Sequence, residues 1–460
     1  MSPRVVVVGS GITGLAAALA LTDAGAAVTV LDGAEHPGGR IRTMAFAGLP
    51  VETGPDAFLA RVPHAADLCR RLGLDLVAPA TGRAFLWARG GLRPLPAGLV
   101  LGVPSDLPAV ARSGLLSPTG LARAALDLVL PRSSFAADPS VGDIVRARLG
   151  PAVQTGLVDP LLGGIHAGDS DLLSAESTSP QLAAAARSGR SLVLTLRRHA
   201  RQAPAVDGPV FLTHPGGLGA VVEALVGTLR AAGTEVALGR PVQRLRRQGS
   251  SWVAEAGPDV AADAVVLTTP APVTASLLGP HAPEAAAALG EIEHSSVVVT
   301  TLAYDRASVR HPLDGSGFLV PRPEGRLMTA STWLSSKWAH LHHPELALIR
   351  VSAGRNGDGR AMAMTDSELI GALHSELSEA VGLGSSPVEA AVTRWPDAFA
   401  QYGRGHGARL QRVETALASV AGLEVAGSAL RGVGLPACIA QGQAAAGRVL
   451  EALGVAAAAG

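Results

Sequence analysis

The chain has 460 residues, of which 48% are apolar and 17% charged, and its formal net charge at pH 7 is zero. A chain of this length exceeds one compact core and predicts two or three domains. Zero net charge provides no field that would hold a nucleic acid, so we expect no nucleic-acid partner.

The two cysteines, Cys69 and Cys438, lie far apart and form no CxxC motif, so we expect neither a metal site nor a redox disulfide. Separate thiols of this kind fit a reducing compartment and favour a cytoplasmic location. The sequence has no uninterrupted apolar stretch of about 18 residues, so we expect no membrane-spanning helix. Peripheral membrane contact stays open, although zero net charge and the lack of a basic amphipathic helix favour helices buried within the protein.

The N-terminal segment has the pattern of a dinucleotide-binding unit. Residues 4–8 are an apolar run typical of a buried parallel strand, and residues 9–14 follow as a Gly-x-Gly-x-x-Gly turn. An alanine-rich helix to about residue 24 and a second strand over 28–31 come next, and an acid ends that strand. The glycines permit a tight turn and close approach of a pyrophosphate, and the acid can accept hydrogen bonds from a ribose. A cleaved signal peptide, or a glycine turn without a ligand, would not need all these parts in register. The predicted nucleotide contacts are Gly9, Gly11, Ile12, Thr13, Gly14 and Asp32.

Pro37-Gly38-Gly39-Arg40 lies just beyond the second predicted strand. This stretch resembles the GGR-like motif that touches the cofactor in FAD enzymes of the amine oxidase and protoporphyrinogen oxidase superfamily. The resemblance implies FAD rather than NAD, with contacts from Gly38 and Gly39 and an ion pair between Arg40 and the pyrophosphate.

The C-terminal segment repeats the strand–turn–helix pattern. Residues 423–426 read as a short buried strand, a glycine-rich turn follows, and a helix is predicted from about Pro436 to Leu453. A helix N-terminus aimed at a flavin would stabilise the negative charge that builds up on reduction. The turn resembles the C-terminal flavin motif of the same superfamily, which implies cofactor contacts from Gly427, Val433, Gly434, Leu435 and Ile439.

Further strands are predicted over residues 234–237, 240–245, 252–256 and 263–269. Together with the two chain ends they predict a nucleotide domain assembled from three separated stretches. In folds of this kind a backbone group near a residue such as Val242 often binds the adenine, so Val242 joins the predicted contacts.

The middle of the chain resembles one branch of the superfamily, the bacterial porphyrinogen oxidases of haem synthesis. The likeness runs from about residue 5 to 450 and includes a GPDAFL at 54–59, a PLLGGIHAGD at 160–169, a GGL at 216–218 and a QYGRGH at 401–406. The sequence departs from the family pattern at Ala57, His166 and Ala400, and Val62 stands where relatives often have a lysine. The resemblance implies that Gly54, Pro55 and Asp56 lie next to the cofactor.

The expected fold class is therefore α/β, with a discontinuous Rossmann-like FAD domain of the two-dinucleotide-binding-domain type. We predict that residues 1–78, 205–275 and 405–460 form this domain, residues 79–204 a helical domain that encloses the substrate, and residues 276–404 a substrate domain with a mixed sheet.

The resemblance implies oxidation of a porphyrinogen to a porphyrin, six electrons in three flavin turns, with O2 as acceptor and peroxide as product. Two observations favour coproporphyrinogen III as the substrate. The arginine-rich, lysine-poor and alanine-rich composition resembles that of high-GC Gram-positive bacteria, whose haem route passes through coproporphyrin. In addition, Val100 stands where animal protoporphyrinogen enzymes carry an arginine. We place Tyr402 and His166 near the flavin or the substrate, although each fits a hydrogen-bonded core ring as well. Arg61, Lys337 and Arg394 are candidate partners for the substrate propionates, with solvated surface charge as the alternative.

Three other functions stay open at this stage: a protoporphyrinogen IX oxidase, another flavin oxidase acting on amines or carotenoids, and an FAD-binding protein without catalysis. Amine oxidases usually have an aromatic cage, which a chain with 3% aromatic residues is poorly equipped to build, although Trp395 and Tyr402 could pair. Docking on the ferrochelatase of the haem pathway is also left open.

Overall fold

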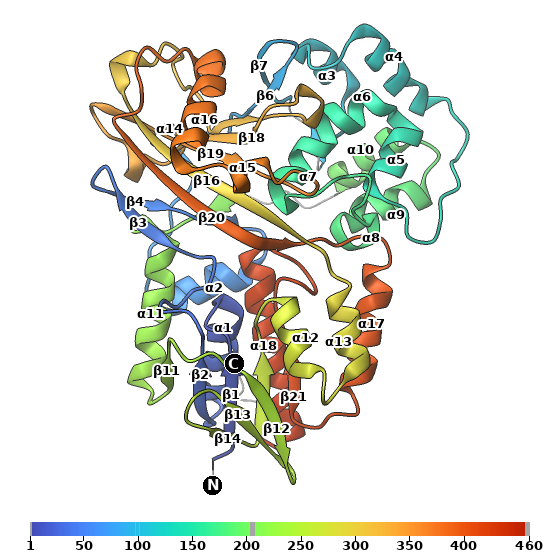
Figure 1. The fold of residues 1–460 in the computed structure, drawn as a ribbon. Helices are drawn as coiled ribbons and strands as arrows, with labels where there is room; N and C mark the ends of the chain where they lie inside the picture. Colours follow the sequence, from blue (N-terminus) through green and yellow to red (C-terminus); the bar gives the residue numbers. More distant parts are fainter. Residues whose placement is uncertain (1, 97, 101, 203–207, 456–460) are drawn as a thin grey trace.

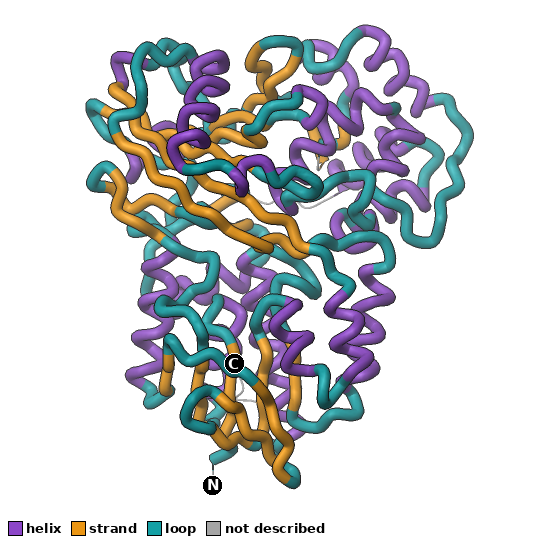
Figure 2. Tube along the Cα trace, in the orientation of Figure 1, coloured by secondary structure: helices purple, strands orange, loops and turns teal. Residues whose placement is uncertain are grey.

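The computed structural model describes residues 2–96, 98–100, 102–202 and 208–455. Figure 1 shows two stacked parts, with the N-terminus and the C-terminal helix in the lower part and a broad sheet with a cluster of helices in the upper part. Figure 2 shows that this broad sheet crosses the molecule above the lower part, and that the helical cluster lies to one side of it.

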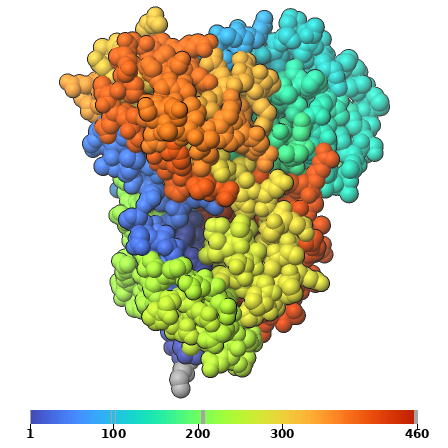
Figure 3. All heavy atoms as spheres, in the orientation of Figure 1, coloured from blue at the N-terminus to red at the C-terminus, as the bar shows by residue number. Residues whose placement is uncertain are grey.

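A parallel five-stranded sheet forms the centre of the lower part. Its order is β11-β2-β1-β15-β21, and every neighbouring pair is parallel. The strands are Arg4–Val8 (β1), Ala27–Leu31 (β2), Glu235–Ala237 (β11), Ala264–Leu267 (β15) and Leu423–Val425 (β21). The central strand β1 is a run of valines buried on both faces, as a parallel strand covered on both sides requires. Three distant stretches of sequence therefore meet in one sheet, as predicted, and their colours adjoin in Figure 3.

Helices cover both faces of this sheet. On one face lie Ile12–Asp23 (α1), Pro63–Arg71 (α2), Leu218–Ala231 (α11) and Leu435–Ala452 (α18). On the other lie Ala271–Leu278 (α12), Pro283–Gly290 (α13), His406–Leu417 (α17) and the antiparallel strands Arg244–Gln248 (β12), Ser251–Glu255 (β13) and Val260–Ala262 (β14). Helices α1 and α18 cross so closely that a side chain at Gly442 would lie 2.2 Å from the carbonyl oxygen of Thr13.

The lower part departs from the sequence prediction in two places. The predicted domain boundary at residue 275 falls inside α12, because α12 and α13 bury their apolar faces against β1 and β15. The predicted strand 240–245 begins only at Arg244 (β12), because the N–H of Arg240 is bonded to the carbonyl of Asp32 at 2.7 Å and Pro241 has no N–H to donate.

The upper part is built on a seven-stranded mixed sheet of order β20-β16-β19-β18-β17-β6-β7, in which only β17 and β6 pair in parallel. Its strands are Phe85–Ala88 (β6), Gly91–Pro94 (β7), His294–Asp305 (β16), Gly317–Leu319 (β17), Met328–Trp333 (β18), Leu346–Ala353 (β19) and Glu389–Ala400 (β20). Because β6 and β7 belong to this sheet, the region predicted as a helical domain from residue 79 contributes its first residues to the substrate sheet instead.

One face of the mixed sheet is covered by Asp366–Val381 (α16), whose apolar stripe Leu369, Leu373 and Leu377 packs on it. Short helices Leu334–Lys337 (α14) and Arg360–Ala363 (α15) flank the sheet. The hairpin Thr43–Phe46 (β3) and Leu49–Glu52 (β4), and the pair Phe58–Leu59 (β5) and Phe211–Leu212 (β10), connect the sheet region to the lower part.

The helical cluster packs around its own core beside this sheet. It contains Leu107–Ser113 (α3), Pro118–Ala125 (α4), Val141–Leu149 (α5), Pro151–Val153 (α6), Asp159–His166 (α7), Ala175–Thr178 (α8), Pro180–Ser188 (α9) and Leu192–Gln202 (α10), with the short hairpin Leu99–Val100 (β8) and Val103–Pro104 (β9). Within the described ranges, every helix is too short or too polar to cross a bilayer.

Candidate flavin and substrate site

The glycine turn of residues 9–14 lies at the carboxyl end of β1, in the middle of the parallel sheet, where α/β folds bind their ligands. Gly9 has φ +107, and a side chain at Gly14 would lie 1.9 Å from the carbonyl oxygen of Gly9. Gly11 differs, because a side chain there would meet no atom within 4 Å. The turn is therefore packed from below and open above, and the first N–H groups of α1, from Ile12, Thr13 and Gly14, point toward this space.

Asp32 ends β2 beside this turn. Its Oδ2 accepts hydrogen bonds from the N–H and the hydroxyl of Ser10, at 2.5 and 2.6 Å, and its Oδ1 accepts one from the N–H of Ala34 at 2.8 Å. A carboxylate has about four acceptor positions. The arrangement therefore fixes the carboxylate and still leaves capacity for a ribose hydroxyl, which agrees with the predicted role.

Arg40 carries a buried charge without a counterion. Its Nη1 donates to the hydroxyl of Ser428 at 3.0 Å, and among the described residues no carboxylate pairs with it. Burial lowers the pKa of Arg40, opposed by the nearby Cys438 thiol. A buried guanidinium with only a neutral partner is unfavourable unless an anion arrives. Gly38 holds this segment against the glycine turn, because its N–H donates to the carbonyl of Ser10 at 2.8 Å. The residues present therefore fit a pyrophosphate.

The C-terminal turn between β21 and α18 faces the same place. Gly427 and Gly432 adopt φ +146 and +111, and Gly434 precedes the first turn of α18, where the predicted contacts Val433, Leu435 and Ile439 lie. Two aromatic residues hold the turn. The hydroxyl of Tyr402 donates to the carbonyl of Ser428 at 2.6 Å and accepts from the N–H of Gly432 at 2.8 Å. Nε2 of His406 lies 2.8 Å from the carbonyl oxygen of Leu430, and its ring stacks on Tyr402 at 4.1 Å.

The mixed sheet presents an uncovered face above these glycine turns. Neighbouring residues of its inner strands are half-exposed, whereas the residues between them are buried under α16. Register places these half-exposed residues on one face, because they pair across the strands. We call this set the slot face; it consists of Leu319, Ala330, Thr332, Arg350 and Ser352. At the two ends of the slot face, Leu319 packs against the helical cluster and Arg350 lies against Gly54 and Asp56. Between them Ala330, Thr332 and Ser352 stay partly exposed, so a ligand could reach the sheet there.

Two segments border the slot face. On one side is α7, where a side chain at Gly164 would lie 3.5 Å from Leu319. On the other is the segment Gly54–Asp56, whose Gly54 carbonyl accepts a hydrogen bond from Nη1 of Arg350 at 3.1 Å. A side chain at Gly54 would lie 1.9 Å from the carbonyl oxygen of Arg40. The predicted cofactor segments and the open sheet face therefore adjoin.

Asp56 is bound within a buried cluster of charges. Nζ of Lys337 lies 2.6 Å from its Oδ2, Nη2 of Arg350 lies 3.4 Å from its Oδ1, and the indole N–H of Trp338 donates to Oδ2 at 3.3 Å. Burial opposes ionisation of Asp56, but the charges of Lys337 and Arg350 and the hydrogen bonds outweigh it and hold the pKa of this carboxyl well below its usual range. The cluster joins the Gly54–Asp56 segment to the mixed sheet.

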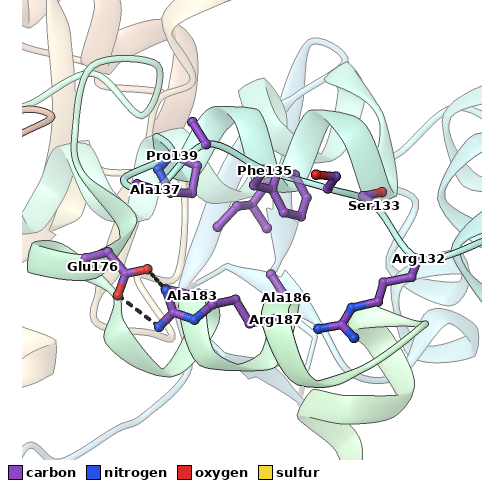
Figure 4. A pocket seen from close by; sticks show the side chains of 12 residues that line it. Arg132, Ser133, Phe135, Ala137, Pro139, Glu176, Ala183, Ala186 and Arg187 are labelled. Atoms are coloured by element: carbon purple, nitrogen blue, oxygen red, sulfur yellow. Dashed lines mark hydrogen bonds and ion pairs between the residues drawn. The ribbon is translucent and has the colours of Figure 1, made fainter.

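A pocket of about 480 Å³ lies elsewhere (Figure 4). It is in the helical cluster, where Phe135 points toward Ala183 and Ala186 of α9 while Arg187 pairs with Glu176. None of its lining residues belongs to the glycine turns or the slot face, so it is no part of the candidate site.

Comparison with known proteins agrees with this geometry. The family described as flavin containing amine oxidoreductase matches residues 12–450. The chain belongs to this family. A coproporphyrinogen III oxidase of Bacillus subtilis is 34% identical over 96% of this chain and 97% of its own length, and one of Mycobacterium tuberculosis is 35% identical over 98% and 99%. A crystal structure described as a putative protoporphyrinogen oxidase from Exiguobacterium is 33% identical, with a TM-score of 0.87 over 98% of this chain and 99% of that one. The predicted family, α/β fold class and FAD cofactor are confirmed.

The surroundings of Tyr402 and His166 favour a structural role for both side chains over a part in the reaction itself. Burial raises the pKa of Tyr402, and both hydrogen bonds of its hydroxyl go to the C-terminal turn. His166 ends α7 with its ring 6.0 Å from that of Tyr402, and its Nδ1 has no partner among the described residues. Burial lowers the pKa of His166 to about 4, so the ring is neutral near pH 7. The ring of Tyr402 stacks on His406, and the indole N–H of Trp395 donates to the carbonyl of Thr53 at 2.7 Å, so the alternative pairing of Trp395 with Tyr402 around a substrate stays a prediction.

The three predicted substrate cations have different surroundings. Lys337 is neutralised by Asp56. Arg394 pairs with Val298 in the sheet, whose side chain is buried under α16, and it forms an ion pair with Asp366. Its guanidinium is therefore on the face opposite the slot face, which disfavours the predicted contact between Arg394 and a substrate. Arg61 is exposed and forms no ion pair with any described residue, which leaves its role a prediction.

The adenine contact of Val242 also stays a prediction. It lies between β11 and β12, and its backbone N–H and C=O make no backbone hydrogen bond within the described chain, so both are free for an adenine.

Sequence reasoning missed Arg350, Glu52 and Thr268. Thr268 steadies the glycine turn, with its hydroxyl 2.9 Å from the carbonyl oxygen of Val8. Glu52 accepts hydrogen bonds from the N–H of Leu218 and the hydroxyl of Thr43, and so caps α11. A signal existed for Arg350, because it is the one charged residue of β19, whose other residues are apolar except Ser352.

Proposed function

We propose that this chain oxidises coproporphyrinogen III to coproporphyrin III, using FAD and three molecules of O2 and releasing three molecules of H2O2. The observation that carries the proposal is the full-length identity of 34–35% with proteins named coproporphyrinogen III oxidases. The partly exposed slot face next to the cofactor segments supports it, because it offers a sheet surface with both apolar and polar side chains beside the flavin, where a tetrapyrrole with carboxylates could lie.

The flavin, when bound, supplies the acceptor for a hydride from a carbon bridge of the substrate. The chain's own residues bind and orient. The α1 N-terminus and Arg40 would hold the pyrophosphate, and Asp32 and Val242 the ribose and adenine. The slot face would hold the ring and exclude water, with Arg61 at its mouth as a proposed partner for a propionate. Each turn removes one hydride and one proton, so three turns account for six electrons. Over the three turns the four carbon bridges lose one hydrogen each and the pyrroles lose two N–H protons, so one of the three protons comes from a carbon bridge after tautomerisation of the ring.

Tyr402 and His166 are proposed as positioning residues in this scheme. The hydroxyl of Tyr402 would keep the C-terminal turn in its flavin-binding shape, and the neutral His166 would keep the end of α7 packed against it. No strong side-chain base is required, because proton loss from the pyrrole follows hydride removal from an activated ring.

The predicted cellular location and the predicted partners are proposals as well. The two free cysteines are buried, which fits a cytoplasmic location. A ferrochelatase that takes the product, and peripheral contact with a membrane, are proposed partners that rest on the family resemblance.

The test is turnover by the purified FAD-loaded protein. Porphyrin fluorescence should rise with coproporphyrinogen III, with three H2O2 formed per porphyrin, and more slowly with protoporphyrinogen IX. Faster turnover of protoporphyrinogen IX would favour the alternative oxidase. Oxidation of amines or carotenoids alone, or bound FAD with no turnover of any of these substrates, would overturn the proposal.

A further inference from the structure

Two arginines of the described chain are almost fully buried, and their surroundings differ. Arg148 is 3% exposed and fully satisfied: it pairs with Asp127 at 2.6 Å and donates to three backbone carbonyls and the hydroxyl of Ser133. Arg355 is 7% exposed, yet within the described residues its guanidinium donates no hydrogen bond and forms no ion pair. A guanidinium has five N–H donors, so burial without an acceptor is unfavourable.

The tip of Arg355 is not sealed inside the protein. Fully enclosed nitrogen atoms without a partner occur at Nε of Arg322 and Nε of Arg350, but none of the nitrogens of Arg355 is among them. Its guanidinium therefore borders accessible space, although the rest of its side chain is buried. An anion could therefore reach the guanidinium of Arg355.

Arg355 lies next to the slot face. It follows Gly354 at the end of β19, three residues beyond Ser352 of the slot face. A side chain at Gly354 would lie 2.8 Å from the carbonyl oxygen of Ser296 at the start of β16, and the N–H of Asn356 donates to the carbonyl of Ala167 at 2.7 Å. The arginine is therefore held between β16 and the C-terminal end of α7, the helix that borders the slot face.

The nearby carboxylates are already engaged. Asp358 is bound by Arg360 at 2.8 Å, and Asp159 lies 3.6 Å from Arg322. Burial lowers the pKa of Arg355 and the positive charge of Arg322 lowers it further, whereas the negative charges of Asp159 and Asp358 raise it. Both carboxylates have an arginine of their own as partner and neither forms an ion pair with Arg355, so a carboxylate that reached Arg355 would provide its first direct counterion.

We propose that Arg355 binds a propionate carboxylate of the porphyrinogen and thereby favours a substrate with more propionates. The inference rests on the proposed function and deepens it. Coproporphyrinogen III carries two propionates more than protoporphyrinogen IX, which has vinyl groups in their place. A cation buried beside the slot discriminates strongly, because a vinyl group would leave its charge unpaired.

The test compares Arg355→Gln with the control Arg83→Gln, which removes an exposed arginine that pairs with Asp314 just before β6. The measured quantities are FAD content, the dissociation constant for coproporphyrin III, that for its tetramethyl ester, and the kcat/KM ratio of the two porphyrinogens. We expect Arg355→Gln to keep its FAD, to bind coproporphyrin III at least tenfold more weakly, and to bind the ester as the wild type does. The kcat/KM ratio should shift toward protoporphyrinogen IX by a similar factor, and Arg83→Gln should change neither quantity.

Two outcomes would overturn the inference: wild-type affinity for coproporphyrin III in Arg355→Gln, or equal losses for the porphyrin and its ester, which would indicate a merely structural role. If Arg355→Gln fails to fold, Arg355→Lys serves instead, because it keeps the charge but not the forked geometry; it should weaken binding of the acid and spare the ester. If the wild type oxidises neither porphyrinogen, the proposed function itself is wrong. If the wild type is active and Arg355→Gln binds coproporphyrin III as the wild type does, only the role of Arg355 is wrong.

Discussion

Replacement of Tyr402 by phenylalanine should weaken FAD binding and leave catalysis by the FAD-loaded enzyme nearly intact. The change removes a hydroxyl that holds two backbone groups of the C-terminal turn, the carbonyl of Ser428 and the N–H of Gly432. Leaving buried backbone groups without partners costs about 1–3 kcal/mol each. Both groups here are half-buried, so water can replace part of the loss, and we expect about 2 kcal/mol in total, or roughly a thirtyfold increase in the FAD dissociation constant.

The assay is titration of the apoprotein with FAD, followed by the quenching of flavin fluorescence. The chain contains only one other tyrosine, Tyr304, whose hydroxyl lies 3.1 Å from Nδ1 of His374 in the mixed sheet. Tyr304→Phe is therefore a matched control that should leave FAD affinity unchanged. An unchanged FAD affinity in Tyr402→Phe combined with a loss of more than a hundredfold in kcat at saturating FAD would show that Tyr402 acts in the chemistry, and the positioning argument would be wrong.

Three further predictions concern charged residues of the site and the sheet. Arg40→Gln should raise the FAD dissociation constant about tenfold or more and yet leave the apoprotein at least as stable, since an uncompensated buried charge is removed; thermal unfolding with and without FAD measures both effects. Burial raises the pKa of Glu52 to about 7, so the folded state holds a proton that the unfolded state releases above pH 4.5. The stabilisation from protonated Glu52 should be complete below about pH 4.5. As the pH rises through 7, the free energy of unfolding should fall by on the order of 3 kcal/mol. Denaturant titrations at pH 5 and 8 should show this fall in the wild type and a smaller one in Glu52→Gln. Arg394→Gln should keep wild-type kcat/KM for coproporphyrinogen III, because Arg394 pairs with Asp366 away from the slot face; a loss of tenfold or more would restore its predicted substrate role.

The nucleotide end of the site could be predicted residue by residue because its determinants are local. The turn at residues 9–14, the acid at Asp32 and the segment 38–40 fall within one βαβ unit, where strand, glycine spacing and helix fix each position relative to the phosphates. The structure keeps this order, with Gly11 facing open space and Gly14 packed against Gly9. Even the discontinuous assembly was foreseeable, since each distant strand ends in its own recognisable turn.

Domain boundaries were harder to predict because they depend on which face of a helix is buried against which core. Residues 271–290 read as apolar helices in either domain, and only the packing of α12 and α13 on β15 assigns them to the lower part. In the same way the hairpin of β6 and β7 follows the nucleotide segments in sequence, but β6 pairs with β17, more than two hundred residues away. A pattern within one strand does not encode such a partner.

The substrate cations could not be sorted from sequence at all, because a charge is available to a ligand only if no counterion reaches it first. Lys337 looked suitable, but Asp56, 281 positions earlier in the chain, takes its charge. Arg355 has no distinctive sequence context, yet the fold buries it beside α7 and leaves its charge unpaired. A buried cation costs free energy in the empty protein, and binding of a carboxylate recovers it. The unpaired arginine is therefore a stronger sign of a substrate contact than any of the arginines whose partners the fold already supplies.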